Sequence, residues 1–88
     1  MAKYELTFLF DKKNEEMIEA IEKMLEEVKA KIVSKEDWGV KRLAYIVKGL
    51  KEAHYVYFEA EITEKDMIKL MARIRLNEKI IRELIVRV

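Results

Sequence analysis

The chain has 88 residues, of which 51% are hydrophobic and 40% are charged, and its 18 Lys and Arg nearly balance its 17 Asp and Glu. This length predicts one domain over residues 1–88, and the composition excludes a disordered chain. Cysteine is absent, which excludes disulfides and thiolate metal sites and is compatible with a reducing, cytoplasmic location. We expect no signal peptide, because the start MAKYELTF lacks a basic region followed by a long apolar segment. We expect no membrane span, because no apolar run approaches the ~20 residues that cross a bilayer.

The first half of the chain changes its hydrophobic period twice. Residues 3–10 alternate between apolar and polar side chains, which predicts a half-buried strand. Residues 15–30 repeat apolar side chains at helical spacing, which predicts an amphipathic helix. Residues 32–47 return to strand-like composition, and Gly39 within them suggests a bulge.

The second half repeats this plan. A turn around Gly49 in residues 48–52 leads to an alternating strand over 53–62. Thr63 is the expected N-cap of a second helix. Its apolar stripe consists of Met67, Leu70, Met71 and Ile74. Residues 80–88 predict a last strand, on which Leu84, Val86 and Val88 share a side.

The order is therefore strand, helix, strand, strand, helix, strand. Each helix has one apolar stripe and each strand one apolar face, so we expect both helices to cover the same face of one sheet. This predicts an α+β fold, the ferredoxin-like βαββαβ two-layer sandwich with a four-stranded antiparallel sheet. Right-handed crossovers place the first and third strands in the centre and the other two at the edges.

The sequence gives little support to an enzyme. His54 is the only histidine, and the two glycines cannot form a phosphate-binding loop. The carboxylates lie mostly on helix exteriors, where a solvated surface explains them. We predict no catalytic residue, no metal site, no cofactor and no small-molecule substrate.

The uncovered sheet face carries Tyr55 and Tyr57 on a central strand. Exposed aromatic rings stack on bases or pack against a protein partner. Tyrosine also suits a half-exposed strand without any ligand, and the neighbouring Glu59 and Glu61 repel phosphate.

Two adjacent cations, Lys41 and Arg42, interrupt the second strand. Consecutive strand residues point to opposite faces, so a bulge at the preceding glycine is expected to bring one to the solvent face and one to an edge. With Lys48, Lys51 and His54 they form a basic rim in the predicted fold. Cations on an edge strand either contact RNA or protect the edge from aggregation, and their spacing does not separate the two.

Residues 36–45 resemble the signature of the bacterial small-subunit ribosomal protein family six. That signature is acidic-Trp-Gly followed by basic residues and Leu-Ala-Tyr-Pro-Ile, and here it reads EDWGVKRLAY. Tyr4 with Glu5, residues 51–56 and residues 75–86 also resemble stretches of the family, in order along the chain.

The resemblance implies a structural, non-catalytic ribosomal protein with the same βαββαβ fold. It implies binding to the central domain of the small-subunit ribosomal RNA, as a heterodimer with small-subunit ribosomal protein eighteen. The implied RNA-binding residues are Lys3, Tyr4, Lys41, Arg42, Lys51 and His54. The expected protein-docking residues are Trp38, Leu43 and Tyr45, with Tyr55 and Tyr57 of the uncovered face.

The chain departs from the family pattern in three ways. Ile46 stands where the family usually has proline, residues 28–32 lack the usual Gly-Gly turn, and proline is absent from the whole chain. Such departures are typical of an idealised sequence, so one alternative is an engineered scaffold without RNA binding. Another is a small-ligand module, which requires a pocket formed by dimerisation.

Overall fold

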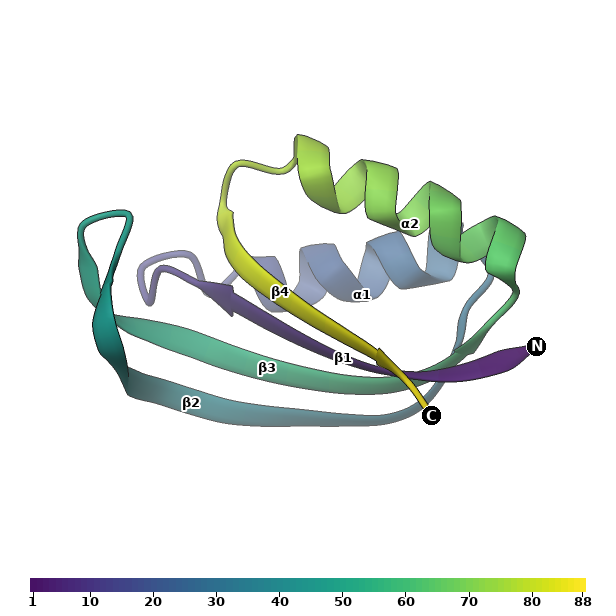
Figure 1. Cartoon of the computed structure of the whole chain (residues 1–88), viewed down its shortest axis with the longest axis horizontal. Helices are drawn as coiled ribbons and strands as arrows, with labels where there is room; N and C mark the ends of the chain where they lie inside the picture. The colour runs from purple at the N-terminus through teal and green to yellow at the C-terminus, as the bar shows by residue number, and fades with distance from the viewer.

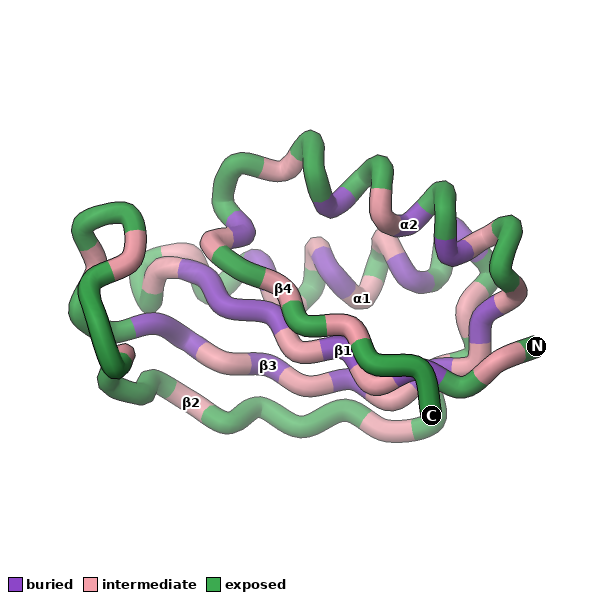
Figure 2. Tube along the Cα trace, viewed as in Figure 1, coloured by how far each residue is buried: buried purple, intermediate pink, exposed green.

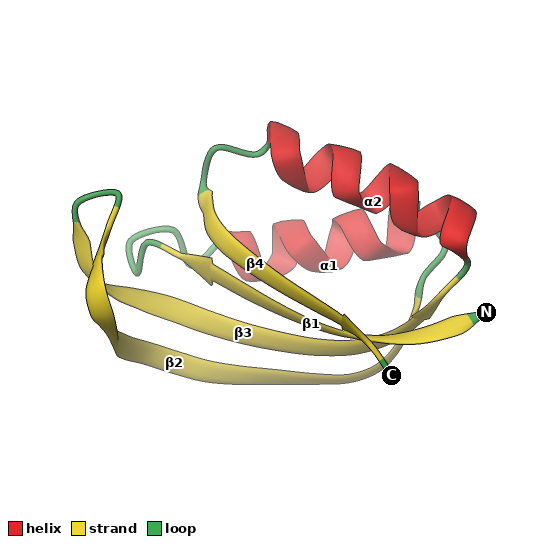
Figure 3. Ribbon diagram, viewed as in Figure 1, coloured by secondary structure: helices red, strands yellow, loops and turns green.

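The computed structural model describes residues 1–88. Its elements are β1 (Ala2–Phe10), α1 (Met17–Glu27), β2 (Lys31–Val47), β3 (Leu50–Ile62), α2 (Glu64–Leu76) and β4 (Ile80–Arg87). The strands form one antiparallel sheet in the order β2-β3-β1-β4, and both helices lie on the same side of it (Figures 1 and 3). The predicted ferredoxin-like fold is confirmed, including the two central strands. No helix has the length and apolar character needed to cross a membrane.

The core lies between the sheet and the two helices. Alternate residues of the central strands are fully buried, among them Leu6 and Phe8 on β1 and Phe58 on β3. The rings of Phe8 and Phe58 meet edge to face with their centroids 6.2 Å apart. Figure 2 shows buried segments on β1, β3 and the inner sides of the helices, whereas β2 is almost entirely unburied. The sheet therefore has one covered face and one open face.

The apolar side of β4 lies on the open face. Leu84 pairs with Thr7 and Val86 with Glu5, both of which point away from the helices. Ile80 and Ile85 lie on the covered face instead, where they pair with Phe10 and Leu6. Their positions differ by an odd number, so both reach the same face only because the register shifts between Leu9 and Phe10. The covered side of β4 also carries Glu83 and Arg87, so the expectation that the more apolar side of this strand, with Leu84 and Val86, would be buried is wrong.

Helix α1 is shorter than the predicted 15–30, and a lysine ends it. Lys29 adopts a left-handed backbone with φ 61°, and the Ala30 N–H donates to the Leu25 carbonyl at 2.9 Å. This is the Schellman closure that glycine normally provides. A non-glycine residue in this conformation costs about 1–2 kcal/mol, so the absence of the Gly-Gly turn leaves a strained exit.

The β2–β3 hairpin extends beyond the body of the sheet. Lys48 (φ 49°) and Gly49 (φ 78°) form its two-residue turn, as expected of a type I′ hairpin. The predicted bulge at Gly39 is confirmed by φ 74° and by a register shift after Asp37. Further out, residues 43–46 all face Lys51 alone, because Arg42 pairs with Glu52 and Val47 with Leu50.

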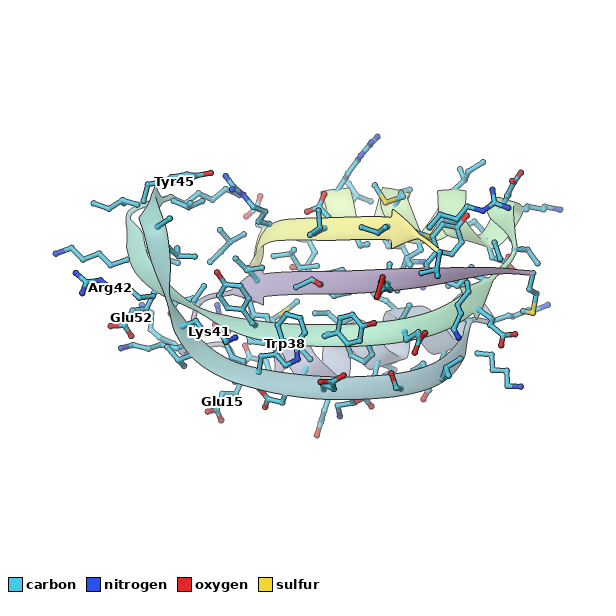
Figure 4. The ribbon with its side chains drawn as sticks, turned by 60° about the horizontal axis from the view of Figure 1, so that its bottom comes forward. Glu15, Trp38, Lys41, Arg42, Tyr45 and Glu52 are labelled. Carbon is cyan, nitrogen blue, oxygen red and sulfur yellow. The ribbon has the colours of Figure 1, made fainter.

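This surplus of residues on β2 bends the end of the hairpin, since a longer strand must curve around a shorter one. We call residues 40–53 the arm. It leaves the plane of the sheet in Figure 1, and Figure 4 shows it curling across one end of the open face.

Candidate functional site

An aromatic cluster occupies the open face where the arm begins. The rings of Trp38 and Tyr57 stack with centroids 5.2 Å apart and an interplanar angle of 6°. The Lys41 ammonium lies 5.2 Å from the centre of the Trp38 ring and 5.8 Å from that of Tyr55. Such contacts are cation–π interactions, so the cluster already binds a cation of its own chain.

A hollow of about 500 Å³ lies between this cluster, the arm and β4. Nine of its twelve lining residues are hydrophobic, which suits it to an apolar group. The lining residues used below are Leu9, Trp38, Leu43, Tyr45, Tyr55 and Leu84. Leu9 is only 8% exposed although it points away from the helices, and it lines the hollow together with Leu43 and Tyr45 of the arm.

A single polar contact joins the arm to the opposite edge of the sheet. The Arg82 guanidinium on β4 donates to the Tyr45 hydroxyl at 2.7 Å and lies 5.5 Å from the centre of its ring. This hydrogen bond raises the pKa of Arg82, which stays charged. The contact holds the Tyr45 part of the arm over one side of the hollow.

Next to the hollow, the open face becomes acidic. We call Glu5, Glu36, Glu59 and Glu61 the acidic band; they come from β1, β2 and β3. Glu5 and Glu59 are direct cross-strand partners, and like charges in that position destabilise a sheet. The Lys3 ammonium lies 3.1 Å from Glu59 and so offsets part of this repulsion.

Tyr57 reports the negative potential of this region. Its hydroxyl donates to a Glu5 oxygen at 2.9 Å. Partial desolvation, this hydrogen bond and the charges of Glu5, Glu59 and Glu36 raise the pKa of Tyr57 to about 12. The negative charges of Glu5, Glu36 and Glu59 therefore add to one another at the Tyr57 hydroxyl on the open face.

The outer side of the arm has the opposite charge. Arg42 and Lys51 line a shallow groove of about 270 Å³, and neither forms an ion pair. Figure 4 shows Arg42 projecting outward while Lys41 and Trp38 lie on the inner side. Lys41 and Arg42 thus point to opposite sides, as their adjacency in a strand predicted. Lys48 at the turn adds a further cation.

Three predicted RNA-binding residues lie away from this groove. Lys3 is paired with a carboxylate of the acidic band. Tyr4 is 8% exposed and belongs to the core cluster. His54 is 7% exposed, so its predicted place on an exposed rim is wrong. It alternates in phase with the buried Val56, and this spacing could have placed it on the covered face.

His54 has a structural environment. Its ring stacks on Phe10 with centroids 5.0 Å apart, and its Nε2 lies 2.6 Å from Asp37 Oδ1. The same oxygen accepts the Gly39 N–H at 2.8 Å. The hydrogen bond from His54 and then that from Gly39 lower the pKa of Asp37. The trio fixes the bulge at the base of the arm.

The residues that β4 and β1 contribute to the hollow were not predicted from the sequence. Leu84 and Arg82 come from the far end of the chain, and Leu9 interrupts the polar side of β1. An apolar residue at a polar position of an alternating strand was the one available signal. No group of three His, Cys, Asp or Glu side chains lies close enough together to hold a metal ion.

A model of the family described as Ribosomal protein S6 matches residues 3–87. Among solved structures, the 30S ribosomal protein S6 from Thermotoga maritima matches with a TM-score of 0.90 at 27% sequence identity, covering 99% of this chain and 87% of that one. The C-terminal domain of the MgtC protein from Mycobacterium tuberculosis matches with a TM-score of 0.65 at 10% identity, covering 100% and 88%. That second likeness concerns the fold alone.

The environment of Asp37 generates a prediction about acid stability. Its folded-state pKa lies below the ordinary value of 3.8, so the charged form stabilises the fold above that value and the stabilisation is lost as the pH falls through the folded pKa. We expect Asp37→Asn to be less stable than the wild type at pH 7, with the difference shrinking below pH 3.8. Urea unfolding between neutral and acid pH measures this difference.

Glu78→Gln is the control, because Glu78 is an exposed carboxylate without an ion pair. Its stability relative to the wild type is expected to change little with pH. A difference between Asp37→Asn and wild type that stays constant into the acid range contradicts the assigned role of Asp37.

Proposed function

The chain belongs to the ribosomal protein S6 family, and on that premise we propose that it binds the central domain of the small-subunit ribosomal RNA together with small-subunit ribosomal protein eighteen. The family consists of structural, non-enzymatic proteins of the cytoplasmic ribosome.

The outer side of the arm is the observation that carries the RNA proposal. Residues 40–52 hold four cations and one carboxylate, Glu52, which has its own partner in Lys12 at 3.7 Å. The net charge of the whole chain is only +1, so this is a local concentration of positive charge. Affinity for RNA depends on such local neutralisation of phosphates. We assign phosphate contacts to Arg42 and Lys51, with Lys48 beside them.

Lys41 holds a position between the two surfaces. Its ammonium lies on the aromatic cluster and reaches a phosphate only by leaving Trp38 and Tyr55. We therefore assign Lys41 a secondary RNA contact. Lys3, Tyr4 and His54 are left out of the proposed RNA surface because of the pairing and burial described above.

The hollow supports a protein partner. Trp38 is 40% exposed and Leu84 61% exposed, and the apolar patch continues through Tyr45 and Val86 along the open face. Contiguous exposed apolar surface on a small protein marks a protein-binding site. We propose that protein eighteen docks here, against Trp38, Leu43, Tyr45 and Tyr55, with Tyr57 supporting Trp38 from below.

The RNA proposal predicts the effect of removing two arm cations. Arg42→Ala with Lys51→Ala is expected to weaken binding to a central-domain RNA fragment in the presence of protein eighteen, and to lower the slope of log affinity against log salt by about 2, roughly one unit per phosphate contact. Filter binding at several salt concentrations measures both quantities.

Lys23→Ala with Lys65→Ala is the matched control, since it removes two exposed cations from α1 and α2. The control is expected to bind as the wild type does. Equal salt slopes for both double variants contradict the assignment to the arm, and a wild-type chain that binds no RNA favours the idealised scaffold.

The partner proposal predicts a large effect of a charge in the hollow. Leu84→Asp places a carboxylate in an apolar contact, where desolvation costs about 1–3 kcal/mol and weakens the affinity for protein eighteen roughly fivefold or more. Isothermal titration calorimetry measures the Kd. Because Leu84 is largely exposed in the free protein, the variant is expected to keep its fold.

Ile68→Asp on α2 is the control, because Ile68 is equally apolar and 72% exposed on the helical side. Its Kd for protein eighteen is expected to match the wild type. If Ile68→Asp weakens binding and Leu84→Asp does not, the partner docks on the helices and the proposal is wrong.

A further inference from the structure

We propose that the open face receives an extended basic segment of its protein partner, with one bulky apolar side chain in the hollow and Lys or Arg side chains on the acidic band. This inference rests on the proposed function, because it names the chemistry of the segment that docks on the surface assigned to protein eighteen. It goes further in assigning a binding role to Glu5, Glu36, Glu59 and Glu61.

The like-charged pair at the centre of the sheet is the first support. Glu5 and Glu59 face each other on the two central strands, where repulsion between them lowers the stability of the free protein. Neither is needed to fill the core, since both lie on the open face. A cation from outside the chain relieves this repulsion, so the band is better suited to the bound state than to the free one.

The cations already present on the open face are the second support. Lys3 lies on Glu59, Lys41 lies over Trp38 and Tyr55, and Arg82 lies over Tyr45. Each occupies a carboxylate or an aromatic ring that also attracts a partner's Lys or Arg. The chain thus shows on its own surface which chemical group this face binds.

The distance between the hollow and the acidic band sets the length of the partner segment that can contact both. Tyr55 lines the hollow and Glu59 lies four residues further along the same strand, a separation of about 13 Å at roughly 3.3 Å per residue. An extended peptide covers this distance in about four residues. The inferred segment therefore carries a large apolar residue with basic residues about four positions away.

RNA is the less favoured occupant of this face. Four carboxylates repel the phosphate backbone, and Lys3, Lys41 and Arg82 are engaged with a carboxylate or an aromatic ring. Lys31, the remaining cation of this face, lies directly across from Glu61 of the acidic band. Arg42 and Lys51, which form no ion pair, lie on the opposite, outer side of the arm. The two sides of the arm therefore separate the RNA from the basic protein segment, even though both partners attach at the same end of the molecule.

The test compares the affinity of protein eighteen for three forms of the full chain by isothermal titration calorimetry between low and moderate salt. Glu59→Gln with Glu61→Gln is expected to raise the Kd about fivefold to tenfold at low salt and to reduce its salt dependence. This double variant removes the Glu5–Glu59 repulsion together with the partly exposed Lys3–Glu59 ion pair. The two losses oppose each other, so the variant is expected to keep its fold, which urea unfolding checks. Glu19→Gln with Glu26→Gln, two exposed carboxylates of α1, is the matched control and is expected to bind as the wild type does.

The outcomes separate the inference from the proposed function. If the wild type and both double variants bind protein eighteen equally well, the partner docks without using the acidic band, and the inference is wrong while the proposed function stands. If the wild type does not bind protein eighteen at all, the proposed partner is wrong and the inference falls with it. Binding weakened equally by both double variants indicates a general charge effect and also overturns the inference.

Discussion

Burial of one face of the sheet, and only one, is the constraint on which the structure depends. The apolar sides of β1 and β3 and the stripes of both helices meet in a single layer built around Phe8, Phe58 and their neighbours. With no second layer, the other face is released from the requirement of being apolar. It can hold an aromatic cluster, a hollow and a band of carboxylates that a covered face would not tolerate.

The arm converts this open face into two distinct surfaces. The bulge at Gly39, fixed by Asp37 and His54, turns the strand, and the extra residues opposite Lys51 bend it. Its inner side closes on the hollow through the Tyr45–Arg82 contact, while its outer side presents Arg42. Strand alternation alone places Lys41 and Arg42 on opposite sides, and the curvature of the arm turns one side towards the hollow and the other away from it.

Much of this fold could be predicted from the sequence, because the alternation in residues 3–10 and 53–62 and the two helical stripes identify one buried side. The alternation in residues 53–62 also predicts a buried position for His54, in phase with Val56. The ionisable ring of His54 suggested an exposed position instead. The buried side of β4 was predicted wrongly, because Leu84 and Val86 make the open side of this strand the more apolar one. The motif around Trp38 identified the part of β2 from which the arm extends. Leu9, Arg82 and Leu84 line the hollow only because the fold brings distant segments together, which the motif does not show. The acidic band was visible as separate glutamates, and only the strand register shows that they are neighbours.

Side-chain footprinting with hydroxyl radicals tests most directly the claim that the open face, rather than the helical face, is the docking surface. The reactivity of Trp38, Tyr45 and Leu84 is compared with that of Ile68 and Leu76, which are exposed on α2, in the free chain and in its complex with protein eighteen. We expect protection of the first three side chains and unchanged reactivity of the two on α2. Protection of Ile68 and Leu76 with no change at Trp38 contradicts the account.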